Sequence, residues 1–273
     1  MRPRPLLLAA LTLLLAASRP AGAGEDATAT DSLTGHQIYD KVLENRFDRS
    51  RQEIRLVSGD RAQNAMEARM TVLWKSWRDE QRNARNGVLS KTLIRYTHPF
   101  DLRFTAYLVI NNQDRVDDQF VYLPSRRRIR RVNLRGEPVL GTDFTFEDVV
   151  PREFEDAQYE RLPDQVQDGR ACYVVVITPR AEANSEYSKL QSWVEREHFV
   201  VLRTQYWDRD GVLVKEALAP ADEVRQFGDV YIPMHTEMRN LVTESWSKLF
   251  VDDFEPNADV ADAEFDPRRL ETH

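Results

Sequence analysis

The chain has 273 residues, of which 41% are hydrophobic, 30% charged and 10% aromatic, and its formal net charge is -7. This composition is typical of a folded globular protein and excludes collagen-like, disordered and polytopic membrane proteins. The acidic balance argues against a nucleic-acid-binding protein, since such domains are usually basic. The single cysteine, Cys172, excludes an intramolecular disulfide and any cysteine-built zinc or iron–sulfur site.

The first 24 residues have the pattern of a secretory signal peptide. Arg2 and Arg4 precede an apolar run over residues 6–17, and small residues then lead to an A-x-A-like cleavage site ending at Ala23. The run is shorter than the roughly 20 residues that span a bilayer, although an N-terminal anchor helix is the alternative. We expect residues 1–24 to be removed and residues 25–273 to form one exported domain, most simply in the periplasm.

One amphipathic helix is predicted near the start of the mature chain. Thr34 and Gln37 have the spacing of a capping box, in which a hydroxyl and an amide side chain three residues later satisfy the first backbone N–H groups. The apolar residues between Ile38 and Phe47 recur at helical spacing. The helix is therefore expected to bury one face.

Alternating apolar and polar residues predict strands over most of the remaining chain. These strands cover residues 66–75, 102–110, 120–123, 171–178, 200–207, 212–218, 232–242 and 246–251. Asp210-Gly211 supplies a hairpin turn, and Asp168-Gly169 supplies another. Nine to eleven strands are expected in all, with short helical pieces near residues 145–150 and 267–270.

The element pattern predicts a mainly β (α+β) fold. Parallel α/β folds need a helix after most strands, and those helices are missing. About ten antiparallel strands must curl, and the predicted helices are too few to cover a flat sheet. We expect a strongly curved, open antiparallel sheet, a half-barrel, with the N-terminal helix and short helices over its concave face.

No catalytic or metal-binding motif stands out. Glu195-x-x-His198 is the nearest approach to a metal motif and is interpreted as a surface pair. There is no G-x-S-x-G, P-loop or G-x-G-x-x-G motif. The acid pairs at 117–118 and 252–253 are interpreted as solvated loop charges, and Cys172 as an inert packed thiol. The sequence therefore predicts no catalytic residue, no metal and no cofactor.

Apolar and aromatic side chains are abundant on the predicted strands. Ordinary core packing explains any one of them, but a curved sheet with few covering helices would also enclose an apolar cavity, which suits a lipid or acyl chain. Each buried CH₂ contributes roughly 0.8 kcal/mol. The predicted cavity residues are Met70, Trp74, Phe104, Leu108, Phe120, Tyr122, Phe144, Phe146, Val175, Tyr206, Met234 and Met238. This interpretation requires a hollow that the protein's own side chains do not fill and that ionisable groups do not line.

Residues 125–135 contain six arginines and no acidic residue in an otherwise acidic chain. Arginine binds phosphate and carboxylate groups in bidentate geometry. Contact with a lipid headgroup or an acidic partner protein is therefore predicted for Arg126, Arg127, Arg128, Arg130 and Arg131. A solvated hairpin paired with acids elsewhere is the alternative.

Two neighbouring segments, Phe120–Arg131 (FVYLPSRRRIRR) and Gly141–Asp148 (GTDFTFED), resemble the signature of the outer-membrane lipoprotein-sorting protein family, a LolA-like group. The similarity extends over about residues 34–271. It implies an open half-barrel with helices across its concave face and a periplasmic carrier of lipidated or otherwise hydrophobic cargo. It also implies an inner-membrane RND-type transporter as partner. The family supplies no agreed catalytic residues.

The function expected from these observations is a non-enzymatic periplasmic carrier. It would hold a lipid, lipoprotein acyl chains or another hydrophobic cargo and pass it between envelope partners, with residues 144–150 as a lid or plug. Peripheral membrane contact fits this hypothesis, and nucleic acid does not. One alternative is a periplasmic adaptor or sensor that docks on an RND-type transporter without carrying lipid. Another is an enzyme of lipid or envelope metabolism, which requires polar groups converging inside the cavity.

Overall fold

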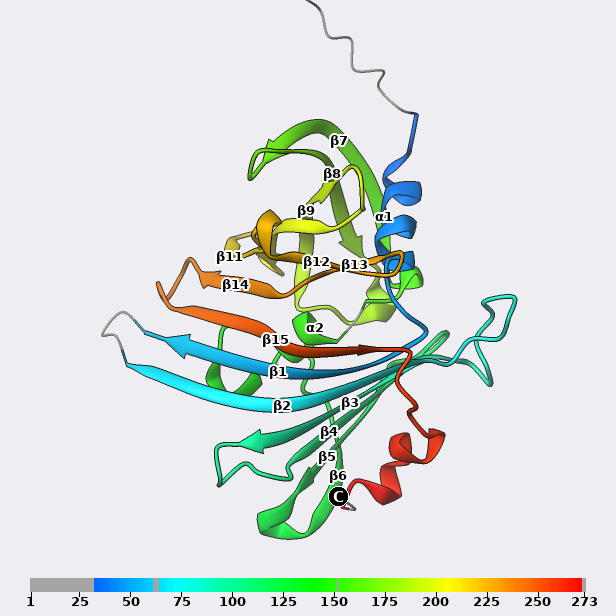
Figure 1. The fold of residues 1–273 in the computed structure, drawn as a ribbon, viewed down its shortest axis with the longest axis vertical. Coiled ribbons are helices and arrows are strands. Elements are labelled where there is room, and N and C mark those ends of the chain that lie inside the picture. Colours follow the sequence, from blue (N-terminus) through cyan, green and yellow to red (C-terminus); the bar gives the residue numbers. More distant parts are fainter. Residues whose placement is uncertain (1–31, 61–63, 151, 272–273) are drawn as a thin grey trace, which may run out of the picture. The chain divides into compact units, whose positions relative to one another are not determined.

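Thirteen strands form one antiparallel sheet that curves without closing into a barrel (Figure 1). The computed structural model describes residues 32–60, 64–150 and 152–271. The predicted signal peptide therefore lies outside the described residues. The described residues from Leu33 onward form one compact unit. Within the described ranges, no helix is long and apolar enough to cross a bilayer.

The strand order along the sheet is β6-β5-β4-β3-β2-β1-β15-β14-β11-β10-β9-β8-β7. Its strands are β1 (Arg49–Gly59), β2 (Ala65–Ser76), β3 (Val88–His98), β4 (Ala106–Asn112), β5 (Asp118–Leu123), β6 (Arg128–Val132), β7 (Ala157–Gln167), β8 (Arg170–Pro179), β9 (Tyr187–Glu195), β10 (Val201–Asp208), β11 (Leu213–Leu218), β14 (His235–Asn240) and β15 (Trp246–Pro256). A separate hairpin pairs β12 (Val224–Phe227) with β13 (Val230–Pro233).

The helices are few, as predicted. The two α-helices are α1 (Gly35–Glu44) and α2 (Phe146–Val149). Short 3₁₀ helices occupy Pro124–Arg126, Val139–Gly141, Phe154–Asp156, Ala181–Ala183, Ala221–Glu223, Asp262–Phe265 and Pro267–Arg269. The mainly β class, the open curved sheet and the helical pieces near residues 145–150 and 267–270 are thus confirmed.

The capping box predicted at the start of α1 is present. The Gln37 backbone N–H donates to Thr34 Oγ1 at 3.2 Å, and the Thr34 backbone N–H donates to Gln37 Oε1 at 2.9 Å. Ile38 and Tyr39 are buried, and they pack with Val175 of β8 in a cluster between α1 and the β7–β9 part of the sheet. The helix therefore starts and buries its face as its local sequence predicts.

The described residues form fifteen strands, which is more than the nine to eleven predicted, and two of the predicted strands differ from the structure. The strand predicted over residues 102–110 begins only at Ala106, because residues 99–105 form a turn in which Phe104 has a φ of 71°. The strand predicted over residues 232–242 is two strands in two sheets, β13 and β14. Pro233 ends β13, since proline has no N–H for a continuing ladder.

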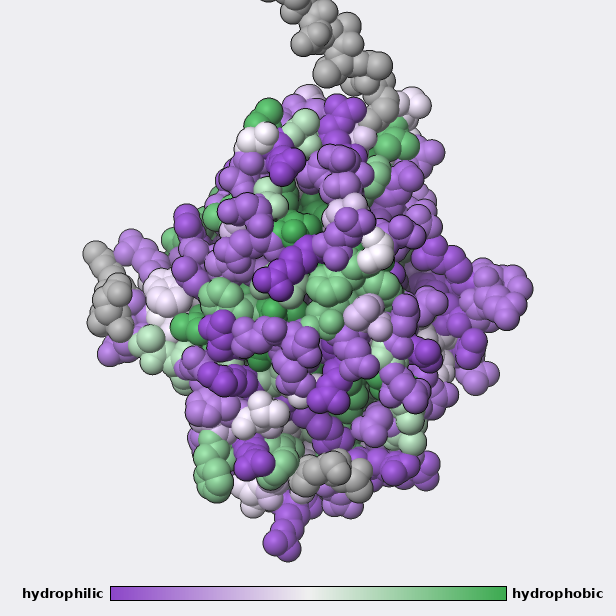
Figure 2. Space-filling view, viewed as in Figure 1, coloured by the Kyte–Doolittle hydropathy of each residue, from purple (hydrophilic) through white to green (hydrophobic). Residues whose placement is uncertain are grey.

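The two faces of the sheet carry different apolar clusters. The concave core includes Ile94, Tyr107 and Met238, together with Phe144 and Phe146 of the α2 segment. The opposite face of β3–β5 is covered by residues 258–270, here called the C-terminal cover. On the face drawn in Figure 2, hydrophobic side chains gather over β14, β15 and β1, with hydrophilic side chains around them.

Candidate functional site

An apolar cavity of about 200 Å³ lies on the concave face. Strands β1, β2, β3 and β15 form its walls, and Arg46, Phe47, Val149 of α2 and Ile232 of β13 complete its lining. Pockets that enclose a drug-sized ligand usually hold roughly 300–1,000 Å³. The cavity is therefore too small, as it stands, to enclose a long acyl chain.

Most of the predicted cavity residues lie on the concave side. Met70 and Trp74 line the apolar cavity directly. Met234 and Met238 are buried in the concave core. Val175 lies beneath α1 in the separate cluster of that helix.

Four predicted cavity residues lie elsewhere, and their predicted position is wrong. Leu108, Phe120 and Tyr122 face the C-terminal cover, because β4 and β5 present the alternate side chains to the concave core. Phe104 is 38% exposed in the turn before β4. All residues from Ala106 to Ile110 are apolar, so alternation could not tell which face is concave.

Two phenylalanines of the α2 segment fill part of the hollow. Phe144 and Phe146 are buried in the concave core, and the Phe146 ring centre lies 4.1 Å from that of Tyr107. The expectation that the protein's own side chains leave the hollow unfilled therefore holds only in part. The segment occupies the position of the predicted plug.

Buried charges anchor this segment to the sheet. Lys215 Nζ of β11 donates to Asp148 Oδ2 at 2.5 Å, and the Tyr187 hydroxyl donates to Asp148 Oδ1 at 2.9 Å. Glu147 accepts from the Ser185 hydroxyl at 2.5 Å and lies 3.7 Å from Arg135. No site role was predicted for these residues, although Glu147 and Asp148 belong to the GTDFTFED segment that carries the family resemblance. The sequence signal for Lys215 is that it is the one cation in the short, largely apolar strand LVKEAL.

A second cavity of about 360 Å³ lies between α1, α2 and strands β9–β10. Tyr39, Leu190 and Tyr206 contribute apolar walls, whereas the charged side chains of Arg46, Glu147, Asp148 and Arg152 also line the space. The requirement that ionisable groups do not line the hollow is therefore not met in this second cavity. Tyr206, one of the predicted cavity residues, therefore lines this second cavity. The second cavity shares Arg46 and Val149 with the apolar cavity, so the two are neighbours.

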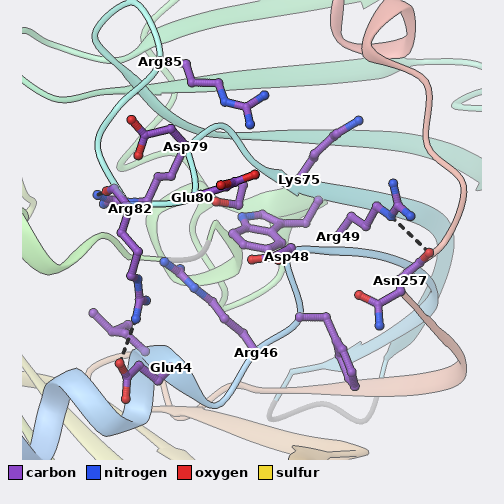
Figure 3. A pocket seen from close by; sticks show the side chains of 15 residues that line it. Glu44, Arg46, Asp48, Arg49, Lys75, Asp79, Glu80, Arg82, Arg85 and Asn257 are labelled. Carbon is purple, nitrogen blue, oxygen red and sulfur yellow. Dashed lines mark hydrogen bonds and ion pairs between the residues drawn. The ribbon is translucent and has the colours of Figure 1, made fainter.

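A polar pocket of about 630 Å³ adjoins the apolar cavity (Figure 3). Six cations line it: Arg46, Arg49, Lys75, Arg78, Arg82 and Arg85. The carboxylates of Glu44, Asp48, Asp79 and Glu80 also line it, so the pocket is charged but not of one sign. Arg46, Phe47 and Trp74 line both spaces, which therefore meet at these side chains.

Arg46 is fixed at this junction. Its guanidinium lies 4.9 Å above the Trp74 ring and donates to Glu153 at 3.1 Å. Glu153, whose side chain is 1% exposed, also accepts from Arg78 at 3.1 Å. A buried carboxylate shared by two guanidiniums holds both of them in place.

The acid pair at 117–118 is not a pair of solvated loop charges, which corrects the interpretation from sequence. Asp117 is largely buried and pairs with Arg135 at 3.0 Å. Burial raises the pKa of Asp117 to about 6, although Arg135 opposes the shift. Asp118 begins β5 and pairs with Arg115 and Arg131. Asp252, in contrast, is exposed on β15 and pairs with Arg55.

The arginine run forms the β5–β6 connection and the edge strand β6. The exposed arginine side chains of the run are Arg126, Arg127, Arg128, Arg130 and Arg131. Within the described residues, the first four of them form no ion pair. Arg131 pairs with Asp118. Charged side chains on a short edge strand also protect it from pairing with another chain.

The remaining polar residues singled out in the sequence have structural contacts. Glu195 accepts the backbone N–H groups of Glu197 and His198, both at 2.8 Å. In the part of the chain that the structure describes, no three His, Cys, Asp or Glu side chains are placed to hold a metal ion. Cys172 is buried, and burial raises the pKa of its thiol to about 11, as an inert packed thiol requires.

One protein family matches the sequence over most of its length. A family model described as "-like: Uncharacterized protein" matches residues 89–272, which is more than half of the chain. No curated protein matches the sequence.

Three solved structures share the fold. A domain described as an outer membrane lipoprotein-sorting protein, from Vibrio parahaemolyticus, superposes with a TM-score of 0.77 at 22% identity, covering 87% of this chain and 98% of that one. A DUF1329 family protein from Desulfovibrio piger gives 0.77 at 19% identity, covering 86% and 97%. A LolA superfamily protein from Nitrosomonas europaea gives 0.67 at 19% identity, covering 86% and 98%. The LolA-like fold predicted from the sequence is therefore confirmed.

Proposed function

The chain belongs to the family matched over residues 89–272 and has the LolA-like fold, and on this premise we propose that it is a periplasmic carrier of an amphiphilic, lipid-like cargo. An acyl chain would occupy the apolar cavity, and the polar end of the cargo would lie in the polar pocket. The observation that carries this proposal is the junction at Arg46, Phe47 and Trp74, where an apolar space continues into a charged one.

Cargo of useful length requires the hollow to enlarge. Two covers are in place, the α2 segment with Phe144 and Phe146, and the β12–β13 hairpin with Ile232. Exposing two phenylalanines costs roughly 3–6 kcal/mol, whereas each CH₂ that replaces them contributes roughly 0.8 kcal/mol. Displacing both rings would therefore require about eight buried methylenes to offset its cost.

Among the described residues the β12–β13 hairpin holds no ion pair, although Phe227 and Ile232 pack against the concave core and Tyr231 stacks on His198. Displacing α2 breaks the buried pair of Lys215 and Asp148, and removing one partner from such a pair costs about 3–5 kcal/mol. The hairpin is tied to the end of α1 by two hydrogen bonds between Asn45 and the Tyr231 backbone, of 2.9 and 2.8 Å. Each contributes about 0.5–1.5 kcal/mol. We therefore assign the β12–β13 hairpin as the gate and the α2 segment as a fixed plug.

The wider setting follows from the resemblance stated above. The carrier would be exported with its signal peptide cleaved near Ala23, serve outer-membrane biogenesis, and exchange lipid or lipidated protein with envelope partners, an RND-type transporter of the inner membrane among them. No catalytic residue is assigned. The non-carrier adaptor remains the competing function, and the partial filling of the hollow by Phe144 and Phe146 favours it.

The test is cargo binding by a variant whose apolar cavity is filled. Val72 lines that cavity on β2, and Val72→Phe should weaken uptake of a fluorescent fatty acid at least tenfold. Val166→Phe, at an exposed position of β7, is the matched control and should bind like the wild type. Native mass spectrometry of the protein from its own periplasm should find lipid. Protein that is empty there and takes up no fatty acid would overturn the carrier proposal in favour of the adaptor.

A further inference from the structure

Exposed hydrophobic side chains are concentrated at one end of the sheet. In the described part of the chain, eight large hydrophobic side chains are exposed, and Phe100 is the most exposed of them, at 88%. Six of the eight lie on or beside the connections at one end: Met66, Phe100, Phe104, Val212, Leu241 and Val242. We call these six residues the apolar rim. The other two, Val116 and Val166, lie at the opposite end.

The topology places the rim residues along one continuous edge. The connections β5–β6, β3–β4, β1–β2, β14–β15 and β10–β11 follow one another at this end, because each joins two neighbouring strands of the sheet. Pairing of Gly59 with Trp246 joins the β1–β2 side to the β14–β15 side. Adjacent connections are therefore two strands apart, about 10 Å. The ends of β1 and β14 lie together at the left of Figure 1.

Positive charge accompanies the hydrophobic side chains where the rim begins. Arg126, Arg127 and Arg128 turn from β5 into β6, next to the β3–β4 connection that carries Phe100. Residues 124–128 contain no acid, and these three arginines are exposed without ion pairs among the described residues. Arg103 lies 4.6 Å from the centre of the Phe104 ring. Cations and apolar side chains thus share one small surface with the exposed carboxylate of Asp101, which the four arginines outnumber.

We infer that the apolar rim and the β5–β6 arginines dock this protein on the surface of an anionic phospholipid bilayer. The guanidiniums bind lipid phosphates, and the exposed apolar side chains enter the interface between headgroups and acyl chains. The net charge of -7 does not prevent this contact, because charges farther away than about 10 Å are screened at 0.1 M salt. The inference does not depend on the cargo proposal.

The spacing of the rim favours a bilayer over a partner protein. A protein interface needs one closely packed apolar centre with a polar surround. Here the hydrophobic side chains stand on separate connections, about 10 Å from one connection to the next, with polar residues between them. A fluid interface admits such side chains one by one, since the lipids rearrange around each of them.

The experiment is cosedimentation of the full chain with phosphatidylglycerol-containing vesicles and with pure phosphatidylcholine vesicles. The wild type should bind the anionic vesicles, less strongly as salt is raised, and bind the neutral ones far more weakly. Changing Arg126, Arg127 and Arg128 together to Gln should weaken binding about a hundredfold. Phe100→Ser should weaken it about tenfold. The matched control, Val166→Ser with Arg170→Gln, changes an exposed apolar and an exposed basic residue at the other end and should bind like the wild type.

Three results would overturn the inference. The first is that the wild type does not bind anionic vesicles at low salt. The second is that the control variant loses vesicle binding as much as the Arg126–Arg128 and Phe100 variants do. The third is capture of an envelope protein through Arg126–Arg128 in the absence of vesicle binding, which would make the surface a protein interface. The Val72→Phe variant keeps the tests separate, because it should lose fatty-acid uptake and keep vesicle binding.

Discussion

Lys215 and Asp148 form an ion pair of 2.5 Å whose side chains are 6% and 2% exposed. The pair joins β11 to α2 across 67 residues of sequence, and Asp148 also accepts from Thr145 and Tyr187. Neither charge can be solvated, so each depends on the other. The α2 segment, with its two core phenylalanines, is thus fastened to the sheet by a contact that favours one position.

The contribution of this ion pair to the free energy of unfolding can be measured directly. Lys215→Met leaves the Asp148 carboxylate buried without its counter-charge and should lower the free energy of unfolding by about 3–5 kcal/mol in urea denaturation. Adding Asp148→Asn should recover part of this loss, because a neutral amide needs no cation. Arg55→Met, which breaks the more exposed Arg55–Asp252 pair, is the control and should cost under about 1 kcal/mol. If the changes in the free energy of unfolding caused by Lys215→Met and Asp148→Asn simply add in the double variant, the two charges do not depend on each other.

Asn45 should control how fast cargo is taken up. Asn45→Ala removes both hydrogen bonds to Tyr231 and frees the β12–β13 hairpin from α1. Because the two bonds together contribute about 1–3 kcal/mol, uptake of a fluorescent fatty acid in stopped flow should accelerate about tenfold. Gln226→Ala removes a side-chain bond within the hairpin turn, of 2.8 Å to Gly228, and should leave the rate unchanged. Equal rates for Asn45→Ala and the wild type would point to α2 as the moving cover.

Local patterns in the sequence predicted the elements that local contacts determine. The capping box at Thr34 and Gln37 placed the start of α1, and alternation from Met66 to Lys75 placed β2. Strands β1, β3, β7 and β9 were not among the predicted strands. The sequence of β1, RSRQEIRLVSG, is mostly polar. Strand β1 is held in the sheet by pairing with β2 and β15, which its own residues do not reveal.

The faces of the sheet could not be assigned from the sequence. Tyr107 and Leu108 are both fully buried, one in the concave core and the other under the C-terminal cover. A strand buried on both faces shows a continuous apolar run instead of alternation. For this reason Leu108, Phe120 and Tyr122 were placed in the cavity, whereas Met70 and Trp74 on the half-polar β2 were placed correctly.

Asp117 predicts a specific pH dependence of stability. Burial raises its pKa to about 6, so the folded state holds a proton that the unfolded state, with a carboxyl pKa near 3.9, releases. Stability contributed by this group is therefore present below about pH 4 and is lost as the pH rises to about 6. The loss by pH 7 is about 3 kcal/mol. Urea denaturation of Asp117→Asn should lack this decline.

The comparison with a second variant isolates the effect of Asp117. Asp101→Asn removes one carboxylate at an exposed position of the β3–β4 turn, so its stability should follow the wild type at every pH. The stability difference between Asp117→Asn and the wild type should grow between pH 4 and pH 6 and then level off. A difference that is constant with pH would show that Asp117 has an ordinary pKa in the folded protein.

Cys172 should be almost unreactive in the folded protein. Its side chain is buried on β8, and burial raises the thiol pKa from 9.0 to about 11. Since only the thiolate attacks alkylating reagents, the reactive fraction at pH 8 falls about a hundredfold, and burial slows access further. Iodoacetamide should therefore label the native protein at least 100 times more slowly than the urea-unfolded chain. Comparable rates would mean that β8 opens readily, and with it the α1-covered part of the sheet.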